Sequence, residues 1–97
     1  VRKEVMSGMW SYLLGQKAKG DKIMDALANK SMEYLIWYLS MSNQQLTISG
    51  QEFMYHIYLL DEEIKIMEKY KSKQASHYAG KLEELYSMYA SRTKAQQ

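Results

Sequence analysis

The most apolar part of the chain is the segment 31–41, in which every residue except Glu33 and two serines is apolar or aromatic. The apolar positions that lead into it recur every three or four residues, which is the period of an α-helix and not the alternation of a half-buried strand. The pattern therefore predicts a helix from about Lys22 to Ser42. Because the second half of this helix is apolar on nearly every side, it needs cover from several neighbours.

Apolar residues with the same period predict a first helix over 3–19. The lysines near its end suit the negative end of the helix dipole. Gly20 is a fitting residue just beyond a helix C-terminus, and Asp21 is a fitting N-cap for the next helix. We therefore expect the chain to turn at the Gly20–Asp21 step.

The clearest predicted loop is 42–49, and a strong helix-start signal closes it. Ser49 and Glu52 have the spacing of a capping box, in which each side chain satisfies a free backbone N–H group. Ile48 and Phe53 have the spacing of a hydrophobic staple around the same point. Together these signals predict that the next helix begins one residue after Ser49.

Apolar residues over 53–67 then step alternately by four and three, which is the pattern of a heptad seam. Polar Lys71 and Gln74 interrupt the seam, and it resumes at Tyr78, Leu85 and Met88 in the same register. No proline or glycine forces a turn at the interruption, so two architectures fit the pattern. The chain either turns near 71–76 or continues as one helix.

Our primary prediction is the turn, which gives an all-α four-helix bundle. The alternative is three helices, with a long C-terminal helix from about 50 to 91. In both cases 97 residues suffice for one domain only, so we expect a single helical domain over 1–97 with 92–97 as a frayed tail.

The composition limits the possible metal and disulfide chemistry and shows how charge is distributed along the chain. The chain has a net charge of +2, eight Met, nine Tyr, no Cys and no Pro. Without cysteine it can form neither disulfides nor thiolate metal sites. Residues 1–30 carry +3, residues 31–63 carry −5 and residues 64–97 carry +4. This layout predicts one acidic and one basic tip, which bears on association and not on the fold.

The apolar run is also the only candidate for a membrane segment. It has about half of the roughly 20 residues that cross a bilayer, and polar residues follow it directly. No secretory signal precedes the first predicted helix. We therefore expect no membrane span and a cytoplasmic protein.

Few residues offer catalytic or metal-binding chemistry. Glu52 and His56 lie four residues apart on one helical face, but a zinc site needs three or four ligands. The acidic run 61–63 has the residue types for paired carboxylates, yet a solvated helix face gives the same pattern. No glycine-rich phosphate loop is present. We interpret His56 as half-exposed and the acidic run as solvated, and we expect no enzymatic activity, no metal and no cofactor.

A row of lysines supports one hypothesis about function. Lys65, Lys69 and Lys73 follow one another at four-residue steps, so on a continuous helix they share a face. Such a row can track phosphates, and Tyr70 beside it can stack on a base. A helix face that is merely solvated has the same lysine pattern. A small nucleic-acid-binding module is therefore the alternative hypothesis and not the leading one.

The surplus of aromatic residues supports the leading hypothesis. Aromatic residues and Met are enriched at protein interfaces, and four short helices cannot hide so many on one side each. The candidate interface residues are Trp10, Trp37, Tyr38, Tyr55 and Tyr58. We therefore expect a non-enzymatic interaction or assembly protein that forms homo-oligomers, with a dimer as the expected state. The composition would also suit a protein of a virus or a mobile element.

Overall fold

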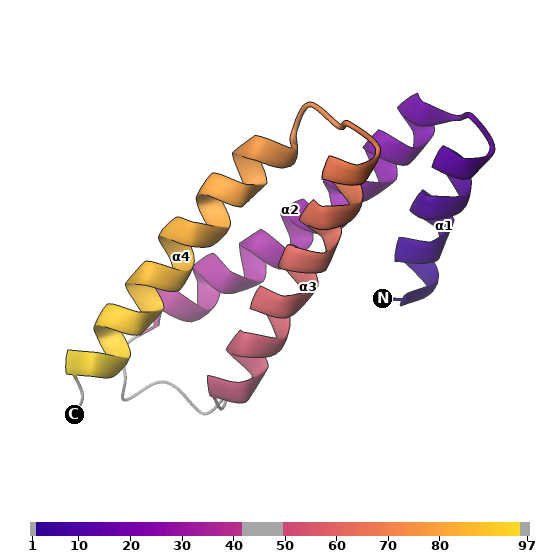
Figure 1. The fold of residues 1–97 in the computed structure, drawn as a ribbon. Coiled ribbons are helices and arrows are strands. Elements are labelled where there is room, and N and C mark those ends of the chain that lie inside the picture. Colours follow the sequence, from indigo (N-terminus) through magenta and orange to yellow (C-terminus); the bar gives the residue numbers. More distant parts are fainter. Residues whose placement is uncertain (1, 42–49, 96–97) are drawn as a thin grey trace.

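The computed structural model describes residues 2–41 and 50–95, in which the chain forms four α-helices and no strand (Figure 1). The helices are α1 (Arg2–Leu13), α2 (Lys17–Ser40), α3 (Gly50–Lys69) and α4 (Ala75–Ala95). The predicted all-α four-helix bundle is confirmed. The alternative with one long helix from about 50 to 91 is wrong, because the chain turns between α3 and α4.

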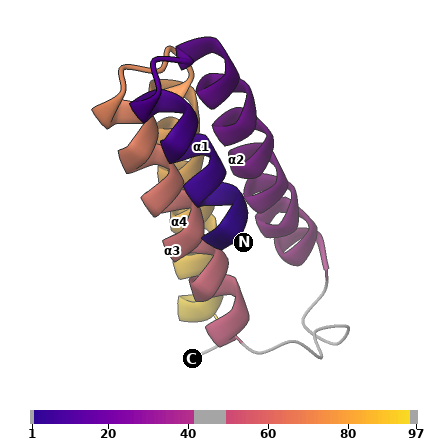
Figure 2. The same cartoon turned by 90° about the vertical axis from the view of Figure 1, so that its right-hand side faces the viewer.

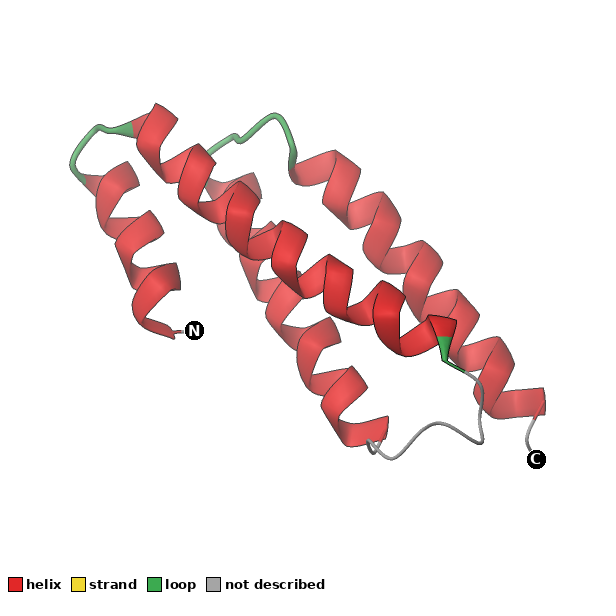
Figure 3. Cartoon of the chain, turned by 180° about the vertical axis from the view of Figure 1, so that it is seen from behind, coloured by secondary structure: helices red, strands yellow, loops and turns green. Residues whose placement is uncertain are grey.

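Three helices form the body of the molecule. α2 packs against both α3 and α4, and α3 packs against α4. α1 runs back along α2, and its side chains also line a groove against α3 (Figures 2 and 3). The α1–α2 and α3–α4 turns lie at the same end of the elongated molecule, which measures 49 × 23 × 15 Å (Figure 1).

The core contains the seam that the sequence predicts in α3. Phe53, Leu60, Ile64 and Met67 are completely or almost completely buried. They pack against the inner faces of α2 and α4 within one hydrophobic cluster. The seam is buried because both neighbouring helices cover it, whereas the opposite face of α3 is exposed to solvent.

α4 follows the predicted seam at Tyr78 and Leu85 but not at Met88, which is 53% exposed. Tyr89 takes the inward place instead and stacks on Phe53, with 4.3 Å between the ring centroids. A helix with 3.6 residues per turn drifts away from a strict seven-residue repeat. The inward position therefore moves by one residue toward the end of α4.

The first turn comes directly after α1, so the prediction of a break at Gly20–Asp21 is wrong. Gly15 has a φ of 79°, a left-handed conformation that glycine adopts without steric cost. The N–H groups of Gly15 and Gln16 bond to the carbonyls of Tyr12 and Ser11, respectively. This pair of hydrogen bonds is a Schellman motif, and it ends α1 five residues before the predicted break.

Gly20 lies inside α2, where it makes room for an aromatic ring. A Cβ atom at Gly20 would lie 2.8 Å from two ring atoms of Tyr12. The Tyr12 hydroxyl donates a 2.6 Å hydrogen bond to Asp21, and its ring stacks on Tyr70 at 4.5 Å between centroids. Gly20 and Asp21 thus fix the packing of α1 on α2 and do not cap a helix.

The α3–α4 turn uses the same motif without a glycine. The N–H of Lys71 bonds to the carbonyl of Glu68 at 3.1 Å, and the N–H of Ser72 bonds to the carbonyl of Met67 at 2.8 Å. Lys71 has a φ of 58°, which costs a residue with a Cβ atom about 1 kcal/mol. The turn occurs where polar residues interrupt the seam, as predicted.

The ends of α3 and α4 bear on two further predictions. α3 begins at Gly50, as predicted, whereas Ser49 and Ile48, which carry part of that signal, lie outside the described residues. α4 continues through Ala95, and Arg92 donates a hydrogen bond to the carbonyl of Tyr38 near the end of α2. The frayed tail expected over 92–97 stays a prediction, and residues 96–97 lie outside the described residues.

The charges form only one of the two predicted tips. The acidic residues of 31–63 are spread along α2 and α3, since Asp61 and Glu62 lie half-way along α3 and Glu52 lies in its first turn, so in the described part of the chain they do not gather at one tip. Lysines do gather at the end that holds the two turns. We call this the basic end, and its lysines are Lys17, Lys19, Lys22, Lys69, Lys71 and Lys73.

Candidate interaction surface and buried polar cluster

The outer face of α3 carries large apolar side chains that the bundle leaves uncovered. The buried seam of α3 faces the core. Met54, Tyr55 and Tyr58 lie on the other side of the helix and point away from the core. Their exposed fractions are 39%, 54% and 60%, respectively. We call these three residues the α3 ridge. Monomeric proteins rarely leave a large contiguous patch of this kind in water.

Two apolar grooves flank the α3 ridge. One lies between α1 and α3, and its lining includes Met6 and Tyr55. The other lies between α3 and α4, and its lining includes Met54 and Tyr86. Tyr58 lines both grooves, so it stands between them. A ridge that stands between two grooves can pack against a copy of itself, since the same patch supplies both shapes.

The second half of the outer face of α3 is charged. Lys65 forms ion pairs with Asp61 at 3.0 Å and with Glu62 at 3.8 Å. The hydrogen bond to Asp61 raises the pKa of Lys65. All three side chains are well exposed, so these pairs contribute little to folding. They remain free to exchange partners when another surface approaches.

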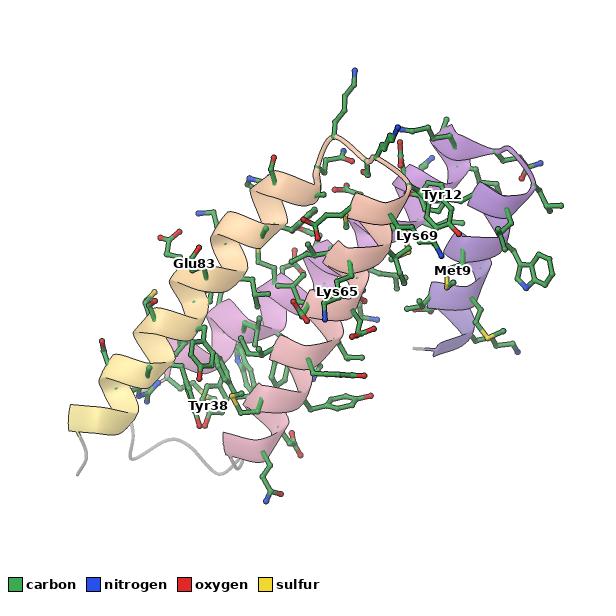
Figure 4. All side chains as sticks on the ribbon, viewed as in Figure 1. Met9, Tyr12, Tyr38, Lys65, Lys69 and Glu83 are labelled. Carbon is green, nitrogen blue, oxygen red and sulfur yellow. The ribbon has the colours of Figure 1, made fainter. Side chains whose placement is uncertain are left out.

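Four of the five candidate interface residues are exposed, and one is buried. Trp10 on α1, Trp37 on α2, and Tyr55 and Tyr58 on α3 are all at least 45% exposed. Tyr38 is corrected, because it is only 4% exposed and packs against Phe53 in the core (Figure 4). Only Tyr55 and Tyr58 lie next to each other on one helix face and beside a groove.

The candidate nucleic-acid residues do not form one row. Lys65 and Lys69 lie on successive turns of α3 (Figure 4). Lys73 lies in the turn after that helix ends. Tyr70 is half-buried, with one face stacked on Tyr12 and the ammonium group of Lys69 5.6 Å from its ring centroid. Tyr12 occupies one face of the Tyr70 ring, so a base could stack only on the other face. Nucleic-acid binding stays a prediction from the sequence.

In comparisons with known proteins, no family model, no curated protein and no solved structure gives a significant match to this chain. Among the described residues, no helix has the length and apolar composition needed to cross a membrane. The same part of the chain holds no group of three or more His, Cys, Asp or Glu side chains placed to share a metal ion. Inferences about function therefore start from the surfaces and the packing.

A buried carboxyl group lies between α2 and α3, and the sequence interpretation missed it. Glu63, expected to be solvated within the acidic run 61–63, is only 1% exposed. The hydroxyl of Ser31 donates a 3.0 Å hydrogen bond to its Oε1 atom. Burial raises the pKa of Glu63 to about 7, and the Ser31 hydrogen bond offsets part of that effect. One signal was available: position 63 lies three residues after Leu60 and four before Met67, within the inward face.

His56 lies on the same side of α3 and is held by an aromatic contact. Its ring stacks on Tyr34 of α2 with 3.8 Å between centroids. Its Nδ1 atom is buried without a hydrogen-bond partner among the described protein atoms. Burial lowers the pKa of His56, while the nearby carboxylate of Glu52 acts in the opposite direction. His56 is thus a half-buried packing residue that prefers to be neutral.

His56 and Glu63 line a cavity of about 150 Å³ between α1, α2 and α3, together with Glu4, Lys30 and Tyr34. A cavity of this size has room for water, which can donate the hydrogen bond that Nδ1 of His56 lacks. A carboxyl group whose pKa lies near 7 exchanges its proton at neutral pH. The arrangement therefore couples the packing of α2 on α3 to pH.

Proposed function

We propose that this chain is a non-enzymatic assembly protein that forms a homodimer through the α3 ridge. The observation that carries the proposal is the position of Tyr58, which is 60% exposed and lies between two apolar grooves of its own chain. A second copy related by a two-fold axis brings the same ridge and grooves to the contact. Each ridge then covers the grooves of the other copy.

An antiparallel pairing of α3 with α3 of the second copy, centred on Tyr58, also matches polarity. Residues at equal distances before and after Tyr58 then face each other across the interface. Lys65 comes opposite Gln51 of the second copy, and Asp61 comes opposite Tyr55 of the second copy. The first pair joins an ammonium group to a side-chain amide, and the second joins a carboxylate to a phenol hydroxyl. Such complementarity favours this register over a parallel one, in which like residues meet.

The surface required for such a contact is modest for this chain. A stable interface buries about 800 Å² on each partner. The accessible surface of the chain is 6665 Å², so the contact takes a small fraction of it. The α3 ridge and the apolar side chains of the two grooves lie at the centre of that area, where interfaces gain most of their binding energy.

Light scattering after size-exclusion chromatography tests the proposal. The full chain is expected to elute as a dimer that dissociates on dilution. Tyr58→Ser is expected to weaken the dimer by at least about ten-fold, because it removes a central aromatic contact. The matched control is Trp37→Ser, which truncates a 45%-exposed aromatic residue away from the grooves and leaves the dimer intact. A monomer at all concentrations, or equal effects of both variants, contradicts the proposal.

A further inference from the structure

α1 buries Tyr12 against the core, but it also leaves large apolar side chains outside. Its small or polar residues Gly8 and Ser11 are buried against α2, whereas large apolar side chains face outward. Trp10, Leu13 and the adjoining Leu14 are 58%, 62% and 68% exposed. We call these three residues the apolar corner. An amphipathic helix whose only partner is its own bundle buries such residues first.

The orientation of α1 is fixed by close packing and not by chance contact. A Cβ atom at Gly8 would lie 2.7 Å from the sulfur of Met24, so only glycine allows α1 to approach α2 this closely. The Tyr12 ring is held in the same interface by its stacking on Tyr70 and its hydrogen bond to Asp21. The outward direction of the apolar corner is therefore built into the fold.

The apolar corner lies at the basic end of the molecule. It adjoins the α1–α2 turn, and the α3–α4 turn lies at the same end (Figures 1 and 2). Residues 14–22 and 68–74 hold six lysines and two acidic residues, a net charge of +4. One of the acidic residues, Asp21, already accepts hydrogen bonds from Tyr12 and Lys17. The lysines are thus in clear excess around an exposed tryptophan and two leucines.

We propose that the apolar corner docks on an anionic lipid surface, with Trp10, Leu13 and Leu14 entering the headgroup region while the lysines contact acidic headgroups. Tryptophan and leucine on a helix with flanking lysines are the residue types that hold helices at membrane interfaces. A second copy fits this place poorly, because two ends of net charge +4 repel each other. The corner also projects at a chain turn, which suits a deformable surface better than a groove. This inference is independent of the dimer proposed above.

Vesicle binding by the full chain tests this inference. The probes are vesicles of phosphatidylcholine alone and vesicles that also contain phosphatidylserine. Because the chain has two tryptophans, Trp37→Phe leaves Trp10 as the only indole reporter. Its fluorescence is expected to shift to the blue and to be quenched by brominated lipid only with the phosphatidylserine vesicles. High salt is expected to weaken the binding, since the headgroup contacts are exposed.

Two sets of variants separate the apolar and the charged contributions. Leu13→Ser with Leu14→Ser is expected to weaken binding by at least about ten-fold, because the lost side chains no longer enter the lipid. Lys19→Glu and Lys71→Glu are each expected to weaken it by about five-fold or more. Lys81→Glu on α4, away from the basic end, is the matched control and is expected to have little effect. Circular dichroism verifies that each variant stays helical.

Several results would overturn the inference. Equal binding to both kinds of vesicle, or an unchanged Trp10 emission, would show that no anionic lipid surface is recognised. Binding that needs the lysines but not Leu13 and Leu14 would mark simple electrostatic adsorption. A Trp10 shift that appears with protein concentration in the absence of vesicles would place a second copy on the apolar corner. None of these results depends on whether the α3 ridge forms the dimer.

Discussion

Replacing Glu63 by Gln tests whether the buried carboxyl group couples stability to pH. The pKa of Glu63 rises from 4.5 to about 7 on folding, because 99% of the residue is removed from water. The folded chain therefore holds this proton more tightly than the unfolded chain. Stability from this group is complete below the unfolded pKa of 4.5, falls as the pH rises, and levels off above about pH 7.

The size of the effect follows from the same shift. Each pKa unit is worth about 1.4 kcal/mol, so ionised Glu63 costs the folded state about 3 kcal/mol at high pH. That is a large part of the roughly 5–15 kcal/mol that stabilises a small domain. Glutamine has almost the same shape and keeps a carbonyl oxygen to accept the hydrogen bond from Ser31. Glu63→Gln is therefore expected to match the natural chain at about pH 4 and to exceed its stability by about 2–3 kcal/mol at about pH 9.

Urea unfolding at several pH values, followed by circular dichroism, measures this difference. The difference between the two chains removes the contributions of other groups around the cavity, namely Glu4, Lys30, Tyr34 and His56. Glu62→Gln is the matched control, since Glu62 is half-exposed and is expected to change stability by less than about 0.5 kcal/mol at any pH. A constant difference between Glu63→Gln and the natural chain from acid to alkaline pH would refute the reasoning.

Three further substitutions test the packing of the helices, and urea unfolding measures each. Gly20→Ala is expected to destabilise the fold by about 1–3 kcal/mol, since its Cβ would collide with the Tyr12 ring. Gly80→Ala is expected to stabilise the fold by about 0.5–1 kcal/mol, since its Cβ would meet open space within a helix. Lys71→Gly is expected to stabilise the α3–α4 turn by up to about 1 kcal/mol by relieving the left-handed backbone; a loss of stability would contradict this. Tyr78→Phe is expected to cost about 1–3 kcal/mol through the lost 2.7 Å hydrogen bond to Asp25, and no change would show that water replaces this bond.

Local patterns were sufficient for much of the fold. The heptad spacing over 53–67 predicted the buried face of α3, and the capping pattern predicted its start at Gly50. The polar interruption predicted the turn before α4. These features depend on the helical period and on backbone hydrogen bonds within a few residues, so the sequence near each position contains the necessary information.

The errors occurred where distant contacts decide between equivalent local signals. Gly15 and Gly20 are both suitable residues after a helix, and only the contact of Tyr12 with Gly20 places the latter inside α2. The helical period places Glu63 on the inward face of α3, but its hydrogen-bond partner Ser31, 32 positions earlier, cannot be found from local spacing. Tyr38 belongs to the core because α3 and α4 cover that side of α2, and the apolar segment 31–41 alone does not indicate which side is covered.

The proposed assembly depends on the α3 ridge being covered by a second copy in antiparallel register. Inter-copy cross-linking tests this most directly, because the chain contains no cysteine of its own. Chains with Gln51→Cys are mixed with chains with Lys65→Cys and oxidised, with a Gln51→Cys and Lys81→Cys mixture as the control. The account predicts a disulfide-linked dimer from the first mixture and much less from the second. Equal linking in both mixtures, or monomer alone in both, would contradict it.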